Sequence, residues 1–236
     1  MIYIENESIN ELYKEIARKM LYLGHEVSPR GKKTIEVNDL YATLLNPRDN
    51  IITLESRNLN REYLKAEMIW YNSGEFNIDY ISQYSSFWKK IADKEGRVNS
   101  NYGGILYYDK TPSNCSQFEW IVDRFKEDRT TRQAVINYNQ VKHKYSGNKD
   151  FPCTLNQQFR ITKRDGIEYL DSTTWMRSND FVYGFPYDVH FFTEVQIRLA
   201  ETLKCEVGRY NHYVSSMHCY LNFKDHKKIL NDVAYE

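Results

Sequence analysis

The chain has 236 residues with 32 basic and 32 acidic side chains, so its formal net charge is zero. A chain of this length buries roughly 70% of its unfolded surface, and we expect a single domain over residues 1–236. A hydrophobic fraction of 41% and a charged fraction of 27% exclude a collagen, a coiled coil and a largely disordered chain. The balanced charge argues against nucleic acid as a partner, and no apolar run approaches the ~18 residues of a membrane span. The first residues lack the pattern of a signal peptide, so we expect a cytoplasmic protein with reduced cysteines.

The first half of the chain predicts helices around one strand. Ser8 and Glu11 form a capping-box pattern, and apolar residues follow at helical spacing. Gly24 and Gly74 are suitable helix stops. The expected elements are a helix over residues 8–23, a basic loop over 28–33, a strand over 34–45, a helix over 60–73 and a helix over 113–126.

From Gln133 onward the pattern changes to strands. Asp165 and Gly166 are a hairpin turn signal between two strand-like runs. The expected elements are strands over residues 133–139, 155–162 and 167–176, a helix over 185–205 and a strand over 211–222. This mixture, without a repeat or a linker, predicts an α+β fold of two layers.

The four cysteines are Cys115, Cys153, Cys205 and Cys219. None has a partner at zinc-site spacing, so we expect no metal. Cys153 stands out because it follows Pro152 and precedes an expected strand, which would hold its thiol on rigid backbone. By itself this pattern leaves two interpretations open, a buried structural cysteine and a nucleophile whose thiolate is favoured by a cationic neighbour.

Several segments together resemble, in the same order, the motifs of the thymidylate synthase and pyrimidine hydroxymethylase superfamily, and the phage-type deoxycytidylate (dCMP) hydroxymethylases among its members. The segments are residues 67–78, 101–103, 131–135, 152–153, 177–180 and 218–220. The resemblance runs over most of the chain. It implies a thymidylate synthase-like fold, with a large mixed β-sheet covered by helices and one sheet face used for a homodimer. It also implies a pyrimidine nucleotide substrate and 5,10-methylenetetrahydrofolate as co-substrate.

The same resemblance implies the catalytic residues. Cys153 would add to carbon 6 of the pyrimidine, which makes carbon 5 nucleophilic toward the methylene group of the folate. Glu67 would manage protons through ordered water. Tyr102 would line the site, and Asp188 would read the base.

Further residues are implied in binding. The nucleotide would contact Arg30, Arg132, Gln158, Arg177, Ser178, Asp188, His218 and Tyr220. Arg177 and Ser178 would hold its phosphate, His218 and Tyr220 its sugar hydroxyl, and Arg132 would come from the second subunit. The folate would contact Asp180 and Trp70.

Asp188 is a departure from the common synthase pattern, which has asparagine at this position. An asparagine amide matches the N–H at position 3 and the carbonyl at position 4 of uracil. Cytosine reverses this pattern. Asp188 can accept from the amino group of cytosine, and it can bind a ring protonated at position 3 or donate to a neutral one. We therefore expect dCMP as substrate and 5-hydroxymethyl-dCMP as product.

Other departures leave alternatives open. Only 16 residues follow Tyr220, and a less covered site would admit water and favour a hydroxymethyl product. Thr154 and Thr131 replace a histidine and an arginine that are common in synthases, so we expect phosphate binding to rely on Arg30. The alternatives are a methyltransferase acting on dUMP or dCMP, an inactive nucleotide- or RNA-binding family member, and a cysteine hydrolase.

Overall fold

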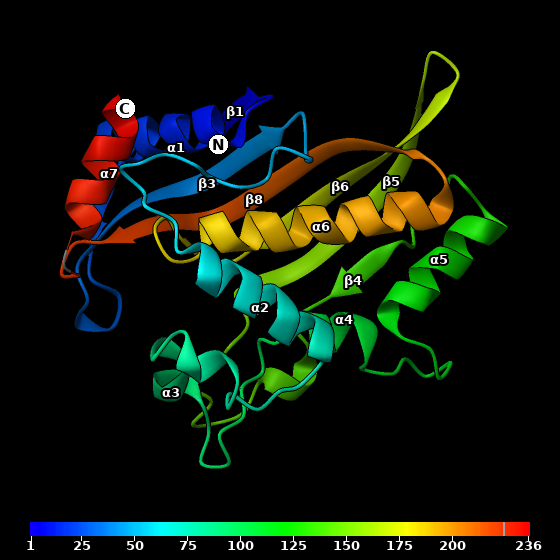
Figure 1. Cartoon of the computed structure of the whole chain (residues 1–236), viewed down its shortest axis with the longest axis horizontal. Coiled ribbons are helices and arrows are strands. Elements are labelled where there is room, and N and C mark those ends of the chain that lie inside the picture. Colours follow the sequence, from blue (N-terminus) through cyan, green and yellow to red (C-terminus); the bar gives the residue numbers. More distant parts are fainter. Residues whose placement is uncertain (224) are drawn as a thin grey trace. The chain divides into compact units, whose positions relative to one another are not determined.

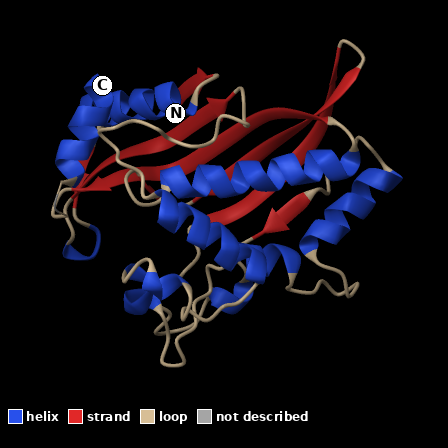
Figure 2. Cartoon of the chain, viewed as in Figure 1, coloured by secondary structure: helices blue, strands red, loops and turns tan. Residues whose placement is uncertain are grey.

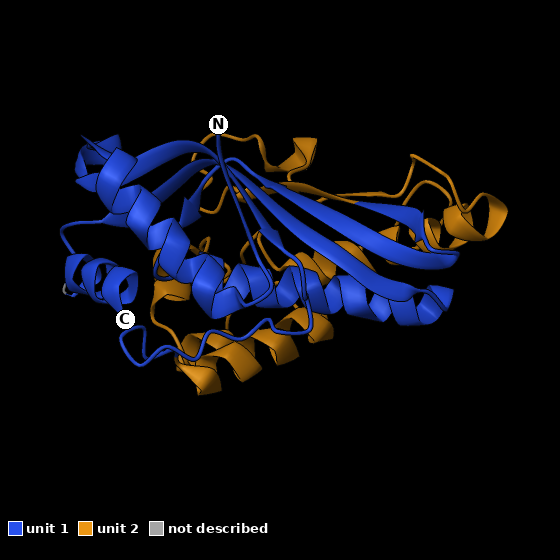
Figure 3. Cartoon of the chain, turned by 90° about the horizontal axis from the view of Figure 1, so that it is seen from above, with its two compact units in different colours: residues 1–59, 159–236 blue, residues 60–158 orange. Residues whose placement is uncertain are grey.

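The computed structural model of the protein describes residues 1–223 and 225–236. The chain forms two compact units, which Figure 3 colours separately. Unit 1 contains residues 1–59 and 159–236, and unit 2 contains residues 60–158. Among the described residues, no helix is long and apolar enough to cross a membrane. Within the same ranges, no group of three or more His, Cys, Asp or Glu side chains is placed to hold a metal ion.

Unit 1 is built on a mixed β-sheet with helices packed against it (Figures 1 and 2). Its strands pair in the order β1-β3-β8-β6-β5, with β2 beside β3 and β7 beside β8. The β1/β3 and β6/β8 pairs are parallel, and the β3/β8 pair is antiparallel. The strands of this unit are β1 (Ile2–Asn6), β2 (His25–Val27), β3 (Thr34–Leu44), β6 (Ile167–Met176), β7 (Asn179–Asp180) and β8 (Glu206–Tyr220). Its helices are α1 (Ile9–Leu23), α6 (Phe185–Leu203) and α7 (His226–Tyr235).

Unit 2 is mainly helical. Within it, α2 packs against α4, α4 against α5, and α5 against β4. Strand β5 (Thr154–Arg164) begins in this unit, where it pairs with β4, and continues into unit 1. The remaining elements of unit 2 are α2 (Arg61–Ser73), α3 (Phe87–Ile91), α4 (Tyr102–Tyr107), α5 (Gln117–Glu127) and β4 (Val135–Asn137), with 3-10 turns at Ile81–Gln83 and Val141–His143.

Local sequence signals account for most of the helix limits. Gly74 ends α2 with a φ of 71°, a left-handed conformation that glycine adopts without steric cost. Helix α5 starts four residues later than predicted, because Ser116 and Glu119 form a complete capping box there. The predicted helices at 8–23 and 60–73 are confirmed to within one residue.

Strand limits were harder to predict. The hairpin at Asp165 and Gly166 is confirmed, and both residues have positive φ values, 49° and 84°. Strand β8 begins at Glu206, five residues before the predicted strand, because Glu206 and Val207 already pair with β6. The elements that local patterns did not reveal are β1, β2, β7, α3, α4 and α7, and all of them are short.

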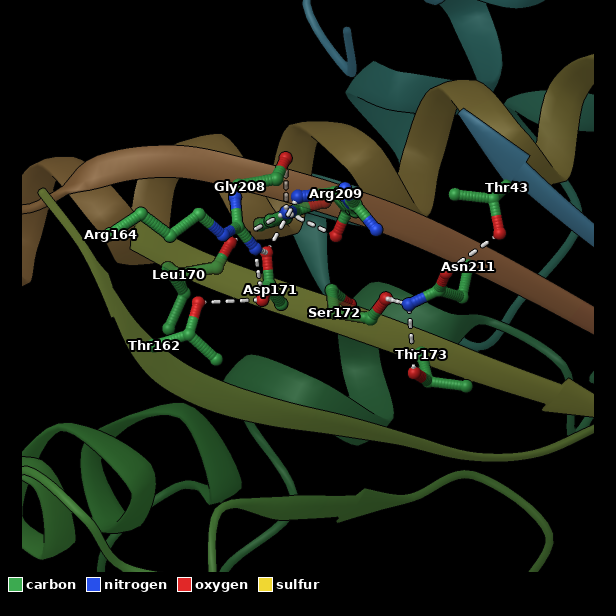
Figure 4. Close-up of polar contacts among 11 residues, drawn as sticks. Thr43, Thr162, Arg164, Leu170, Asp171, Ser172, Thr173, Gly208, Arg209 and Asn211 are labelled. Atoms are coloured by element: carbon green, nitrogen blue, oxygen red, sulfur yellow. Dashed lines mark hydrogen bonds and ion pairs between the residues drawn. The ribbon is translucent and has the colours of Figure 1, made fainter. Parts of the chain in front are cut away.

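A β-bulge in β8 is filled by one carboxylate (Figure 4). Gly208 and Arg209 lie opposite the single residue Asp171 of β6. Asp171 accepts hydrogen bonds from the backbone N–H of Arg209 at 2.7 Å, the hydroxyl of Thr162 at 2.8 Å and the guanidinium of Arg164 at 2.6 Å. A Cβ at Gly208 would lie 2.1 Å from Oδ1 of Asp171, so only glycine fits. The bulge sets the register of β6 against β8. Arg177 and Ser178 follow the far end of β6, and His218 and Tyr220 lie at the far end of β8.

Gly103 in α4 allows a close approach to α2. A Cβ at this position would lie 1.9 Å from the backbone carbonyl oxygen of Tyr71, which cannot move as a side chain can. We expect Gly103→Ala to lower the free energy of unfolding by about 3 kcal/mol through overpacking. Denaturant titration measures this. The matched control is Gly31→Ala, where φ is 75° but nothing lies within 4 Å, and we expect a loss of about 1 kcal/mol. Equal losses in the two variants would contradict the steric explanation.

Candidate active site

The backbone on both sides of Cys153 is held by hydrogen bonds. Asn139 donates to the carbonyl of Pro152 at 2.9 Å, and the N–H of Thr154 donates to the hydroxyl of Tyr102 at 3.4 Å. Cys153 itself is half-buried and lies immediately before β5. The backbone is therefore held on both sides of the residue that carries the thiol, and the hydroxyl of Tyr102 is hydrogen-bonded to Thr154, which follows Cys153.

Cys219 differs from Cys153 in its surroundings. It is completely buried in β8, and this burial raises the pKa of its thiol to about 12, with the charge of Asp180 contributing in the same direction. A thiol with so high a pKa supplies almost no thiolate near neutral pH. Cys219 is therefore a structural cysteine.

Glu67 lies on α2 with only 7% of its surface exposed. It accepts a hydrogen bond from the hydroxyl of Tyr63 at 2.6 Å, and that hydroxyl accepts in turn from the indole N–H of Trp88 at 3.2 Å. A buried carboxyl group held by a phenol has a fixed orientation, which general acid–base chemistry requires.

Three other predicted residues of unit 2 lie in different environments. Trp70 is 1% exposed, donates to the carbonyl of Asn77 at 3.0 Å and packs edge-on against Trp88. This environment makes it a core residue, and its contact with folate stays a prediction. Gln158 is half-buried on β5, in register with Val135, and Arg132 is exposed.

The predicted residues of unit 1 gather where β6 ends. Arg177 and Ser178 follow β6, and in β7 Asp180 is paired with His218 of β8. The hydroxyl of Ser178 lies 3.3 Å from Nδ1 of His218, whose ring packs edge-on against Tyr220 at 5.1 Å. Residues 40 positions apart in sequence are thus neighbours through the β7/β8 pairing. Arg30 is far from these residues in the sequence. It lies in an exposed 3-10 turn, Pro29–Gly31, and its φ is 53°.

Asp180 has one carboxylate oxygen engaged and one available. Oδ1 accepts from the backbone N–H groups of Val182 and Tyr183, at 2.7 and 2.6 Å. Oδ2 is buried and makes no hydrogen bond to the residues that the structure describes. An unpaired buried carboxylate oxygen is costly unless a ligand satisfies it. This atom is the strongest sign of a ligand contact in unit 1.

Asp188 lies in the first turn of α6, half-buried. Its Oδ2 accepts a hydrogen bond from the side-chain amide of Asn179 at 2.6 Å. Desolvation of this carboxyl group by the surrounding protein raises its pKa to about 7. The hydrogen bond from Asn179 lowers the pKa, and the negative charge of Asp180 raises it further. Near neutral pH, Asp188 therefore exists in both protonation states.

Comparison with known proteins places the chain in a family. The family model described as thymidylate synthase matches residues 11–233. The chain belongs to the thymidylate synthase family. The predicted α+β fold, a mixed sheet covered by helices, is confirmed, and the predicted resemblance with it.

Three similar family members are phage enzymes. Deoxyuridylate hydroxymethyltransferase of Bacillus phage SP01 is 28% identical over 222 residues, which are 90% of this chain and 57% of that protein. Deoxycytidylate 5-hydroxymethyltransferase of Enterobacteria phage T4 is 26% identical over 174 residues, covering 69% and 68%, and that of phage T2 matches to the same extent. The chain thus spans little more than half of the SP01 protein. These relatives carry out the same type of transfer, according to their names, on two different pyrimidines.

Sequence reasoning missed three residues that are joined to Asp188 by hydrogen bonds, Asn179, His212 and Tyr210. Asn179 lies in the family-like segment 177–180, but no binding or catalytic role was predicted for it. His212 and Tyr210 lie on β8, outside all of the family-like segments. Tyr210 and His212 are two residues apart and so share a face of the strand, and the ring of Phe185 in α6 packs against His212. That alternation was the only available signal, and buried aromatic positions in a strand are usually core.

Proposed function

We propose that this chain is a deoxycytidylate 5-hydroxymethyltransferase, which transfers the one-carbon unit of 5,10-methylenetetrahydrofolate to carbon 5 of dCMP. Membership of the family supports the transfer of one-carbon units to pyrimidine nucleotides. The choice of cytosine rests on one observation, the half-buried carboxyl group of Asp188 with its pKa raised to about 7.

A protonated carboxyl group is complementary to cytosine. Its O–H donates to the ring nitrogen at position 3, and its other oxygen accepts from the amino group at position 4. Uracil offers an N–H at position 3, which opposes that O–H, and a carbonyl at position 4, which opposes the accepting oxygen. Both contacts are then mismatched, and each mismatched buried hydrogen bond costs about 1–3 kcal/mol.

The proposed chemistry starts with addition of the Cys153 thiolate to carbon 6 of the base. A carbon–sulfur bond forms, the electrons of the 5,6 double bond shift toward carbon 5, and the ring nitrogen at position 3 takes the proton of Asp188. Carbon 5 then attacks the methylene group of the folate. After loss of the proton at carbon 5 and release of tetrahydrofolate, hydroxide adds to the exocyclic methylene group. Cys153 then leaves as thiolate, and the proton at position 3 returns to Asp188. Glu67 would transfer protons through water.

The remaining predicted residues would bind the two substrates. Arg177 and Ser178 would hold the nucleotide phosphate, because a guanidinium pairs strongly with phosphate oxygens. His218 and Tyr220 would contact the sugar, and the unpaired Oδ2 of Asp180 would accept from the folate. Gln158, Arg30 and Arg132 are proposed to contact the nucleotide and Trp70 the folate.

A second candidate is the same reaction on dUMP. It is favoured by the SP01 relative, whose name specifies deoxyuridylate. A hydroxymethyl rather than methyl product is supported by the names of both the SP01 and T4 relatives.

Product analysis tests the proposal. Purified protein is incubated with 5,10-methylenetetrahydrofolate and either dCMP or dUMP, and the mass of the product nucleotide is measured by mass spectrometry. We expect dCMP to gain CH₂O and tetrahydrofolate to be released. A gain of CH₂ with dihydrofolate would identify a methyltransferase, and a larger kcat/KM for dUMP than for dCMP would refute the base assignment.

A homodimer is part of the proposal. One face of the sheet in unit 1 carries aromatic side chains that stay partly exposed, the pairs Tyr3 with Tyr41 and Trp175 with Tyr213. Tyr3 is 53% exposed. Large rings on an open sheet face are typical of a surface that another protein surface covers. In such a dimer the exposed Arg132 would complete the phosphate site of the other subunit.

Mixing two inactive variants tests this arrangement. Cys153→Ser and Arg132→Ala subunits are each expected to be inactive alone, whereas a hybrid dimer would contain one intact site. Random reassociation should restore about a quarter of the wild-type activity. The control pair is Cys153→Ser with Glu67→Gln, because both residues would serve the same subunit's site and no activity should return. An active enzyme that sediments as a monomer would contradict the prediction.

A further inference from the structure

A chain of buried polar side chains leads away from Asp188. Its members are Asn179, His212 and Tyr210, with exposed fractions of 3%, 1% and 1%. Nδ2 of Asn179 lies 2.6 Å from Oδ2 of Asp188, Oδ1 of Asn179 lies 3.2 Å from Nε2 of His212, and Nδ1 of His212 lies 2.8 Å from the hydroxyl of Tyr210. All four residues belong to unit 1.

The direction of these hydrogen bonds follows from the carboxylate at one end. An ionised Asp188 only accepts, so Asn179 must present its NH₂ group to it. The amide oxygen of Asn179 then faces His212 and requires a hydrogen on Nε2. Nδ1 of a neutral imidazole is left as an acceptor, which the hydroxyl of Tyr210 satisfies.

The charge states agree with this direction. Burial lowers the pKa of His212 to about 3, so the ring is neutral and carries one hydrogen. Burial raises the pKa of Tyr210 well above its usual value, so its hydroxyl keeps the hydrogen that it donates. The titratable groups that act on Asp188 within this cluster are Asp180 and Tyr210, while His212 contacts it only through Asn179.

The two oxygens of Asp188 are therefore not equivalent. Oδ2 already accepts from Asn179, whereas no hydrogen bond to Oδ1 is found within residues 1–223 and 225–236. We propose that Asn179, His212 and Tyr210 are positioning residues for base selection, because they hold Oδ2 of Asp188 as an acceptor and so place the carboxyl proton on Oδ1. This inference rests on the proposed function, in which that proton meets position 3 of cytosine.

The direction of these hydrogen bonds matters because the side chains of Asn179, His212 and Tyr210 could also form them with donor and acceptor exchanged. If the amide of Asn179 turned over, its oxygen would accept a proton held on Oδ2 of Asp188. Oδ1 would then be an acceptor, which suits the N–H of uracil rather than the bare nitrogen of cytosine. The hydrogen that His212 donates prevents this reversal, because reversal would also require a hydrogen to move from Nε2 to Nδ1.

The test compares binding of the two nucleotides. Dissociation constants for dCMP and dUMP are measured by calorimetry on wild type, His212→Phe and Tyr210→Phe, below and above neutral pH. For His212→Phe we expect the preference for dCMP to fall about tenfold or more, since the amide of Asn179 loses its fixed direction. Tyr210→Phe should reduce the preference for dCMP by about threefold, since Nδ1 of His212 loses only the hydroxyl that donates to it.

The control is His190→Phe, the same substitution of a half-buried histidine on α6. His190 lies 3.0 Å from Oδ1 of Asn50 and outside the chain of bonds, so the preference should not change. Tyr210→Phe removes one atom, so it keeps the test usable if His212→Phe does not fold. A merely structural role would weaken dCMP and dUMP binding by the same factor and leave the pH dependence of their ratio unchanged.

The outcomes separate the inference from the proposed function. A wild type that binds dUMP more tightly would refute the base assignment and with it this inference. A wild type that prefers dCMP, with the same preference and pH dependence in His212→Phe and Tyr210→Phe, would refute the inference alone. A reduced preference in both variants, with an unchanged one in His190→Phe, would support it.

Discussion

Replacing Cys153 by serine is expected to abolish turnover, lowering kcat by about a thousandfold or more. The reaction needs a nucleophile that adds to carbon 6, and a serine hydroxyl without a dedicated base is a far poorer nucleophile than a thiolate near neutral pH. The hydrogen bonds that hold this segment, from Asn139 to Pro152 and from Thr154 to Tyr102, involve no atom of the thiol. The variant should therefore keep its fold, its unfolding midpoint and its affinity for the nucleotide.

The matched control is Cys115→Ser, another half-buried cysteine of unit 2. Its sulfur lies 3.2 Å from the hydroxyl of Thr111, a contact that a serine hydroxyl can reproduce. Cys115→Ser should retain near wild-type kcat. If Cys153→Ser kept more than about a tenth of wild-type kcat, Cys153 would not be the nucleophile.

Replacing Asp188 by asparagine is expected to remove most of the preference for dCMP over dUMP. We expect a wild-type ratio of kcat/KM on the order of a hundredfold, from two mismatched hydrogen bonds on uracil. With no carboxylate at position 188, the direction of the hydrogen bonds through Asn179, His212 and Tyr210 is no longer fixed, so the amide can present either edge to the base. The ratio in Asp188→Asn should thus approach one. A ratio unchanged from wild type would show that Asp188 does not read the base.

The pH dependence gives a second measure of the same residue. Because the neutral form of Asp188 is proposed to bind cytosine, kcat/KM for dCMP should fall as pH rises through about 7. Asp188→Asn should lack this component. The free energy of unfolding should also fall as pH rises. The pKa of Asp188 is higher in the folded than in the unfolded state, so its contribution to stability is complete below about pH 4 and is lost as pH rises through about 7.

Elements whose signals are local could be predicted from the amino-acid sequence. Capping residues, glycine stops and the Asp165-Gly166 turn depend only on neighbours along the chain, and the long helices and the hairpin were predicted from them. The order of the motifs was enough to indicate the family, which the family model confirmed. Residue roles and the homodimer stay predictions.

Contacts between residues that are distant in the sequence became visible only in the folded protein. The β7/β8 pairing brings Ser178 to His218, and the packing of α6 on β8 joins Asp188 through Asn179 to His212. Hydrogen bonds of this kind span 33 and 40 positions, and no local pattern encodes them. The pKa of Asp188 is likewise set by how much protein surrounds it, because desolvation depends on packing rather than on sequence neighbours. The identity of residue 188 could be read from the chain, but the protonation that lets it select a base is a property of the fold.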